Sequence, residues 1–470
     1  MFQSINNLLL PLLCCLTFIY SSQALNAQTR VKVPDPRAFG FDIPPALVSY
    51  NVKGNVEVRD NDGKKVVGRI HVTVGTNLII EMPDGTLVAK NVTELKKTDA
   101  RFTGMAKKEL EQRKREEFPS FKIRSSNHYV FVYNTTDEFA NVTMRILESM
   151  VPGIMNHSKA QRIKVKSPDV PLVVIMFATQ KQYAEYSDVP NGVVAFYDIK
   201  QNHVVMYEKP DRPPFKQEIY YRQAISTIAH EGAHQILHNI GVQQRLSRWP
   251  MWLSEGIAEY YAPTEFGKRL KWKGAGVIND MRMFELESYI KAKNAEQVDG
   301  QMVSQTVVAA RLTSTGYASA WALTHYLATR KRSNFNAFIK EVSQLRPLEG
   351  AIEQSSNGTF ESNKELFSKH FGEDFGELER DLVTHLKRQP YDHPFSEYAH
   401  FVSSIRIRSG KKYYGTADVF HSRELAIQWQ QQQINKLTQE QQNTAQIELQ
   451  IFVNRKVAES YATQWLRANR

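Results

Sequence analysis

Cysteine is almost absent from this chain. Its 470 residues include only Cys14 and Cys15, and both lie in residues 1–27, a segment that contains no Lys, Arg, Asp or Glu. If that segment is removed on export, the remaining protein has no thiol, which excludes disulfide bonds and thiolate metal ligands. Any metal site in the rest of the chain must then be built from histidine and carboxylate side chains.

A hydrophobic run long enough to cross a membrane is also missing. The apolar stretch near the N-terminus runs only from Leu8 to Tyr20, whereas a spanning helix needs about 20 residues. Such a segment is typical of a secretory signal peptide, here with possible cleavage after Ala24 or Ala27. Together with the lack of cysteine, this predicts a secreted or periplasmic bacterial protein without a stable membrane span. An uncleaved membrane anchor is the alternative.

Positive charge is in excess, with a formal net charge of +11. No motif of a nucleic-acid-binding fold accompanies this charge, so we predict no nucleic-acid partner. A basic exported protein can instead be attracted to anionic cell-wall polymers or to acidic polypeptides.

The most informative segment is His230-Glu231-Gly232-Ala233-His234. Residues four apart lie on one face of a helix, so both imidazoles can hold the same metal ion. Glu231 lies about 100° round the same turn, where it can reach a water at an open coordination position. The alternative is a helix with two solvated histidines. Apolar residues on most sides of the segment predict a buried helix instead: Ile219, Ala224, Ile225, Ile228, Ala229, Ala233, Ile236 and Leu237.

A second acidic helix follows, over the segment Trp252 to Tyr261. Pro250 suits its start and Pro263 its end. Glu255 and Glu259 are four residues apart and share one face. One of them can complete a metal site, and the other can accept the free N–H of a ligand histidine.

The two segments HEGAH and WLSEGIAEYY together resemble the gluzincin metallopeptidases, the thermolysin-like and aminopeptidase-like clan. The closest likeness is to poorly characterised secreted bacterial members with a W-L-x-E-G-x-A-E-Y motif, and it covers roughly residues 125–390. The resemblance implies a Zn²⁺ ion held by His230, His234 and Glu255, with Glu231 as the general base. Glu259 stands where many relatives have an aspartate that supports a ligand histidine.

The same resemblance implies a catalytic tyrosine. Tyr317 lies in the region where aminopeptidase-like relatives place one, and its hydroxyl could stabilise the developing oxyanion. His325 is the alternative donor. His238 is an alternative ligand, one turn beyond His234. The metzincins, a rival clan, are excluded because their glycine and third histidine would fall at Leu237 and Ile240.

These residues predict a zinc-dependent peptidase that acts on peptide or protein substrates. A zinc ion activates its bound water, Glu231 accepts the proton, and the same carboxyl can return it to the leaving amine. The absence of a Gly-x-Met-x-Asn motif favours an endopeptidase over an aminopeptidase. The competing hypothesis is a non-catalytic, zinc-retaining protein that binds a ligand or the cell wall.

The order of strands and then helices predicts an α+β fold. We expect a zincin-like domain, with a mixed sheet and a mainly helical half, preceded by a small all-β barrel. The expected segments are a signal peptide (1–27), a Pro-rich extended segment (28–48), the barrel (49–100), a charged helical linker (101–120), the metallopeptidase domain (121–390) and a Gln-rich helical extension (391–470).

The barrel is predicted from alternating apolar residues with turns at Asp62-Gly63 and Asp84-Gly85. Its pattern resembles a Src-homology-3-like adaptor module, which implies peptide or wall binding. A spacer or a packing partner for the catalytic domain is an equal alternative.

In the catalytic domain we expect strands at 128–133, 172–177, 193–197 and 203–207. Substrate could bind by strand addition to an edge strand near the metal, and the last of these is our candidate. The expected helices lie at 137–151, 217–239, 305–329, 334–345, 363–370 and 373–388.

Overall fold

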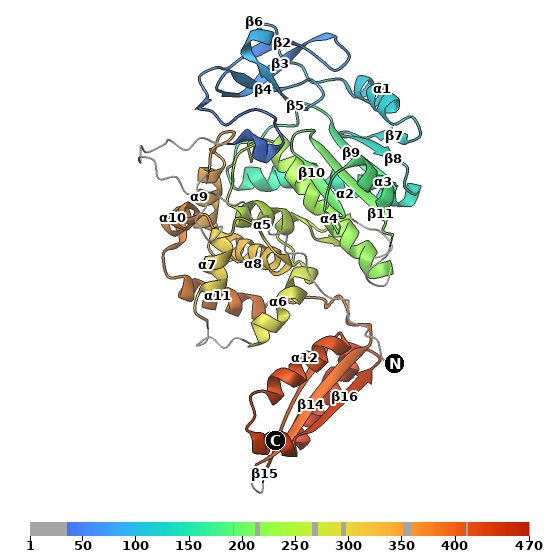
Figure 1. The fold of residues 1–470 in the computed structure, drawn as a ribbon, viewed down its shortest axis with the longest axis vertical. Coiled ribbons are helices and arrows are strands. Elements are labelled where there is room, and N and C mark those ends of the chain that lie inside the picture. The colour runs from blue at the N-terminus through green and yellow to red at the C-terminus, as the bar shows by residue number, and fades with distance from the viewer. Residues whose placement is uncertain are drawn as a thin grey trace, which may run out of the picture.

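The computed structural model describes residues 35–190, 192–211, 217–265, 271–292, 298–350, 359–409 and 412–469. The predicted signal peptide and the first part of the Pro-rich segment lie outside these residues. Figure 1 shows three parts in a row: an antiparallel sheet, a central part with a mixed sheet and most of the helices, and a C-terminal module. The predicted α+β class is confirmed. No helix in the described ranges is long and apolar enough to span a membrane.

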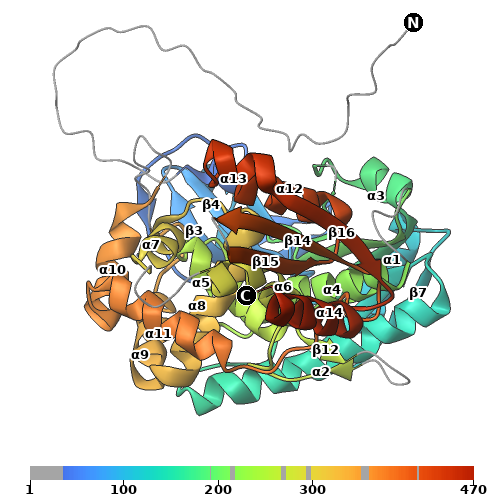
Figure 2. The same ribbon diagram turned by 90° about the horizontal axis from the view of Figure 1, so that it is seen from below.

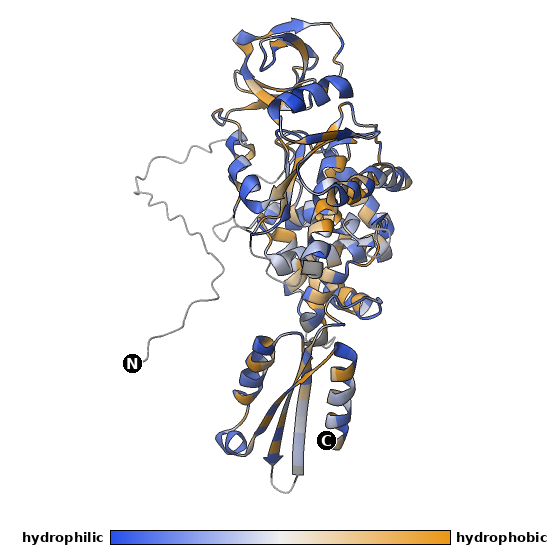
Figure 3. Ribbon diagram, turned by 90° about the vertical axis from the view of Figure 1, so that its right-hand side faces the viewer, coloured by the Kyte–Doolittle hydropathy of each residue, from blue (hydrophilic) through white to orange (hydrophobic). Residues whose placement is uncertain are grey.

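The N-terminal part is one antiparallel sheet in the order β5-β4-β3-β2-β6, with β1 added to β3, and it curls back on itself (Figure 3). The predicted turns are present, and Gly63 and Gly85 adopt φ angles of 76° and 88°, which glycine accepts at little cost. The elements are the 3-10 helix η1 (Pro36–Phe39), β1 (Val48–Ser49), β2 (Asn55–Arg59), β3 (Lys65–Val74), β4 (Asn77–Glu81), β5 (Leu87–Asn91), η2 (Val92–Glu94) and β6 (Lys96–Thr98).

This sheet packs directly on the central part. The Arg245 guanidinium donates hydrogen bonds to the carbonyl oxygens of Gly85 and Ile199, at 2.6 and 3.0 Å. The Leu87 amide donates to the Lys200 carbonyl at 2.8 Å. One apolar cluster also joins sheet residues to Leu246 and Leu348 of the central part. These contacts support the packing-partner alternative, whereas peptide or wall binding by the sheet stays a prediction.

The central sheet has the order β10-β11-β9-β8-β7. Strands β8, β9 and β11 are parallel to one another, and β10 and β7 pair antiparallel at the edges. The prediction that 203–207 forms the edge strand is wrong, because that strand is β11 and has neighbours on both sides. The elements are α1 (Lys107–Glu117), β7 (Lys122–Ser125), β8 (Tyr129–Tyr133), α2 (Asp137–Ala160), β9 (Leu172–Thr179), α3 (Gln180–Tyr186), β10 (Ala195–Asp198) and β11 (His203–Lys209).

The chain then becomes mainly helical. One predicted helix, 305–329, is two helices in the structure, because the helical conformation is interrupted at residues 309–313. The elements are α4 (Gln217–Asn239), α5 (Met251–Tyr261), β12 (Thr264–Glu265), β13 (Lys271–Trp272), α6 (Asp280–Ala292), α7 (Gln301–Val308), α8 (Ser314–Arg330), α9 (Arg332–Val342), α10 (Glu361–Phe371) and α11 (Phe375–Lys387).

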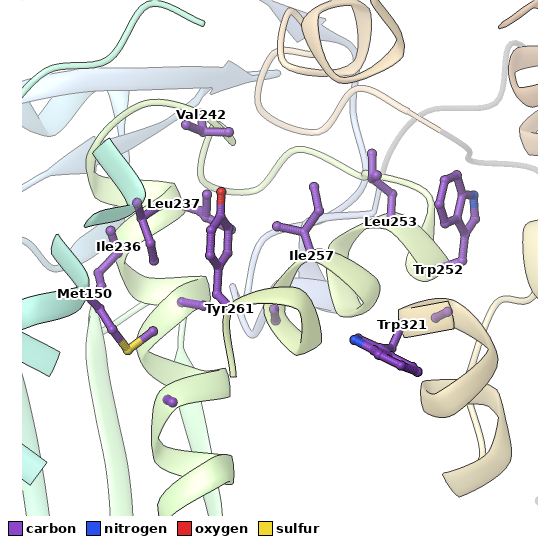
Figure 4. Close-up of a cluster of buried hydrophobic side chains, with 14 of the residues drawn as sticks. Met150, Ile236, Leu237, Val242, Trp252, Leu253, Ile257, Tyr261 and Trp321 are labelled. Carbon is purple, nitrogen blue, oxygen red and sulfur yellow. The ribbon is translucent and has the colours of Figure 1, made fainter. Parts of the chain in front are cut away.

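One buried apolar core ties α2, α4, α5 and α8 together. Figure 4 shows side chains from these helices meeting there, with Met150 from α2, Ile236 from α4, Ile257 from α5 and Trp321 from α8. This core holds α4 and α5, the two helices with the predicted metal ligands, against each other.

The C-terminal module differs from the predicted helical extension, because it contains a three-stranded antiparallel sheet in the order β15-β14-β16. Helices α12 and α14 lie on opposite sides of this sheet (Figure 2). The module is anchored to α6 by an ion pair between Arg455 and Glu287. Its elements are β14 (His400–Ser409), β15 (Lys412–Phe420), α12 (Arg423–Ile434), α13 (Gln439–Thr444), β16 (Gln446–Phe452) and α14 (Arg455–Ala468).

Candidate metal centre

Two packed helices bring the predicted ligands together. His230 and His234 are buried on one face of α4, and Glu255 comes from α5. Gly256 allows α5 to approach α8 closely, because a Cβ there would lie only 2.5 Å from the Ala320 carbonyl oxygen. The position of Glu255 therefore depends on a glycine next to it in the sequence.

The three side chains present one donor atom each to a common point. Nε2 of His230 lies 3.2 Å from Nε2 of His234 and 3.2 Å from Oε2 of Glu255. Nε2 of His234 lies 3.4 Å from the same carboxylate oxygen. Three donors bound to one tetrahedral ion at 2.0–2.1 Å would be about 3.3 Å apart. This His–His–Glu group can therefore hold a metal ion, consistent with an HExxH-type site.

Glu259 supports the first histidine. Its Oε1 lies 3.0 Å from Nδ1 of His230, so a proton on Nδ1 leaves Nε2 free to bind a metal. Arg282 donates to Oε1 of Glu259 at 2.7 Å, and Asn279 donates to Oε2 at 2.8 Å. Burial alone would raise the pKa of Glu259, but Arg282 and His230 hold it to about 2. Glu259 thus stays a carboxylate and keeps His230 oriented.

Glu255 is also held ionised. Burial alone would raise the pKa of this carboxyl, but His234 and His230 hold it well below its ordinary value. An ionised carboxylate and a neutral imidazole nitrogen are the forms that bind metal ions.

Glu231 lies beside the ligands without joining them. Its Oε2 accepts a hydrogen bond from the backbone N–H of Tyr197 in β10, at 2.9 Å. Burial raises the pKa of this carboxyl above its ordinary value. A carboxylate made more basic in this way is suited to accept a proton.

Two clefts meet at the donor group, and His230, Glu231 and Tyr317 line both of them. The smaller cleft, about 400 Å³, has α6 along one side. The larger cleft, about 840 Å³, contains His234 and Glu255 and extends past Phe39 of η1. Ala38 and Phe39 of the Pro-rich segment therefore form part of a wall of the groove.

The other predicted residues are placed as follows. The ring of Tyr317 in α8 lies 6.1 Å from the ring of His230. His238 is not a member of the ligand group, and its Nδ1 lies 3.3 Å from the Gln243 carbonyl oxygen. His325 is not among the residues that line either cleft, and it faces His385 at 3.1 Å in the helical core.

Arg282 and Asn279 were missed by sequence reasoning. Asn279-Asp280 is a helix-start signal that could have located α6, but no pattern links a lone arginine to Glu259, 23 positions away.

The comparison with known families matches the same region. Residues 224–349 match a family described as a protein of unknown function, DUF1570. That range contains the part of α4 that carries His230 and His234, all of α5, and Tyr317. No curated protein matches the chain.

Zinc titration of the metal-stripped protein tests the ligand set. We expect one tight equivalent in the wild type, and its loss in His234→Ala and Glu255→Ala. Glu259→Gln should weaken zinc binding by about 10–100-fold, because the support of His230 is lost. His238→Ala is the matched control on the same helix and should bind zinc like the wild type. Tight binding that survives His234→Ala would contradict this assignment.

Proposed function

We propose that this protein is a zinc-dependent peptidase that cleaves peptide bonds within a chain and acts outside the cytoplasm. The observation that carries the proposal is the convergence of His230, His234 and Glu255 in an open groove, with Glu231 beside them. Two imidazoles and one carboxylate leave an open coordination position, the donor set of catalytic rather than structural zinc sites. The chain has no cysteine after Cys15, so no thiolate is available there to select a different metal ion.

The residues of the chain have distinct roles in this reaction. A bound zinc ion would supply Lewis-acid activation of a water molecule and of the scissile carbonyl. Glu231 accepts the proton of the attacking water and returns it to the leaving amine. The Tyr197 amide fixes the carboxylate in the orientation that this transfer requires. Tyr317 donates a hydrogen bond to the carbonyl oxygen as negative charge develops there.

Strand β10 is a suitable docking edge for the substrate. Among the described strands it pairs only with β11, and Val193 and Ala195 line both clefts. An extended peptide could hydrogen-bond to the free edge of β10, which would set its register relative to Glu231. The strand that we predicted for this role was β11, so the proposal moves to its neighbour.

Two clefts that meet at the donor group support cleavage inside a chain. An aminopeptidase needs a group that binds the substrate amine at one end of the groove, and the expected Gly-x-Met-x-Asn motif is absent. Cleavage of an unstructured polypeptide is therefore expected to give fragments that end at internal positions of its sequence, rather than single residues released from one end.

Glu231→Gln tests the general base. We expect zinc to remain bound while kcat for peptide hydrolysis falls by about 10²–10⁴-fold, because the amide cannot accept the proton. The measurement is hydrolysis of a broad peptide library, with the zinc content of each sample determined. If the wild type binds zinc but cleaves no peptide, the alternative of a non-catalytic binding protein is correct.

Tyr317→Phe tests the oxyanion donor. Burial, with a contribution from Glu255, raises the pKa of the Tyr317 hydroxyl, so it keeps its proton at neutral pH. We expect kcat to fall by about 10²–10³-fold with little change in KM, zinc content or melting temperature. An unchanged kcat would show that Tyr317 only packs against His230.

A further inference from the structure

The larger cleft contains two arginines, Arg248 and Arg311. Its only acidic lining residues among those described are Glu231 and Glu255, which belong to the metal centre. Neither arginine has a carboxylate partner among the described ion pairs. This half of the groove therefore carries positive charge that the protein does not neutralise.

Arg248 is the more informative of the two because it is half-buried. Its Nε is buried and has no hydrogen-bond partner among the described residues. Asp35 is the nearest candidate, but its carboxylate is engaged by Arg37 at 2.8–3.2 Å, and Arg248 reaches only the Asp35 carbonyl, at 3.5 Å. The guanidinium instead packs on the Phe39 ring, 5.6 Å from its centroid. An unsatisfied buried donor destabilises the folded protein, so its presence calls for an explanation.

A second unsatisfied donor lies in the same cleft. The indole N–H of Trp249 is buried and also lacks a partner in the described parts of the chain. Arginine and tryptophan side chains can only donate hydrogen bonds. Both groups would therefore be satisfied by an acceptor, and the arginine would be satisfied best by an anionic one.

Arg282 in the smaller cleft provides the contrast. It is also half-buried, but it pairs with Glu259 at 2.7 Å and with Glu285 at 2.8 Å. Its charge is used within the protein to support His230. The two halves of the groove thus differ: one arginine is neutralised internally, and the other is left for a ligand.

We propose that the larger cleft is a specificity subsite for a carboxylate of the substrate, bound by Arg248 with Arg311 at the exposed rim. The subsite rests on the proposed peptidase function and names its substrate class as peptides that place a carboxylate in the larger cleft. A planar guanidinium can bind a carboxylate through two parallel hydrogen bonds, and the Phe39 ring holds it in place for this. The carboxylate is either an Asp or Glu side chain or the free C-terminus of the peptide.

The test uses purified zinc-loaded protein and matched peptides that differ only by Glu or Gln near the cleaved bond. Each peptide is made as the free acid and as the C-terminal amide. For the wild type we expect kcat/KM to be about 10–100-fold higher with the carboxylate. Faster cleavage of the Glu peptide than of the Gln peptide identifies a side-chain carboxylate. Faster cleavage of the free acid than of the amide identifies the C-terminus. Equal cleavage of all four peptides would overturn the proposal.

Variants assign the preference to Arg248. Arg248→Gln should lose it, and Arg248→Lys, which keeps the charge without the paired donors, should retain only part of it. Arg467→Gln, which removes one exposed charge in α14, is the control for net charge and should retain the full preference. Melting temperatures show that each variant is folded. A preference that persists in folded Arg248→Gln would contradict the proposal.

The two proposals can fail separately. If the wild type hydrolyses no peptide, the proposed function fails, and the subsite is then tested by calorimetric binding of the same peptides to the zinc-loaded protein. Tighter binding of the Glu peptide, lost in Arg248→Gln, supports the subsite. Equal affinities overturn it.

Discussion

Oε2 of Glu255 lies 3.2 Å from Nε2 of His230 and 3.4 Å from Nε2 of His234. Taking a carboxylate out of water costs several kcal/mol unless partners compensate. Around this point lie the carboxylates of Glu231, Glu255 and Glu259, and Arg282, which pairs with Glu259, is shared with Glu285. A divalent cation would offset negative charge that Arg282 leaves unbalanced. The apolar core packs α4 against α5, and balanced charges lower the cost of burying these carboxylates between them. The centre of the fold and the proposed chemistry therefore meet at the same site.

The outer parts of the molecule fix the elements that surround this centre. The Leu87 amide of the N-terminal sheet donates to Lys200 in the turn between β10 and β11. Arg245 of the central part bridges Gly85 of the N-terminal part and Ile199 of this turn, and the Tyr197 amide of β10 binds Glu231. The C-terminal module holds α6 through Arg455 and Glu287, and α6 carries Arg282, which orients Glu259. Each part thus contacts an element that touches a residue of the metal centre.

The metal ligands could be predicted because their signals are local. Residues 230 and 234 share a helix face by spacing alone, and the apolar residues around them indicate burial. Features that depend on tertiary contacts could not be predicted in this way. The edge strand depends on how β9, β10 and β11 are ordered, so β11 was chosen wrongly. The strands of the C-terminal module were hidden by its glutamine-rich composition, although Ile405-Arg406-Ile407-Arg408 alternates like a strand. The contrast between Arg282 and Arg248 is visible only once their neighbours are known.

The most direct test of the account is the zinc K-edge X-ray absorption spectrum of the purified zinc-loaded protein. The account predicts a four-coordinate ion with two imidazole nitrogens and oxygen ligands at about 2.0–2.1 Å, without sulfur. In Glu255→Ala and His234→Ala, this signal should be lost together with the bound zinc. A first shell of oxygen alone, or a spectrum that is the same in wild type and His234→Ala, would contradict the account.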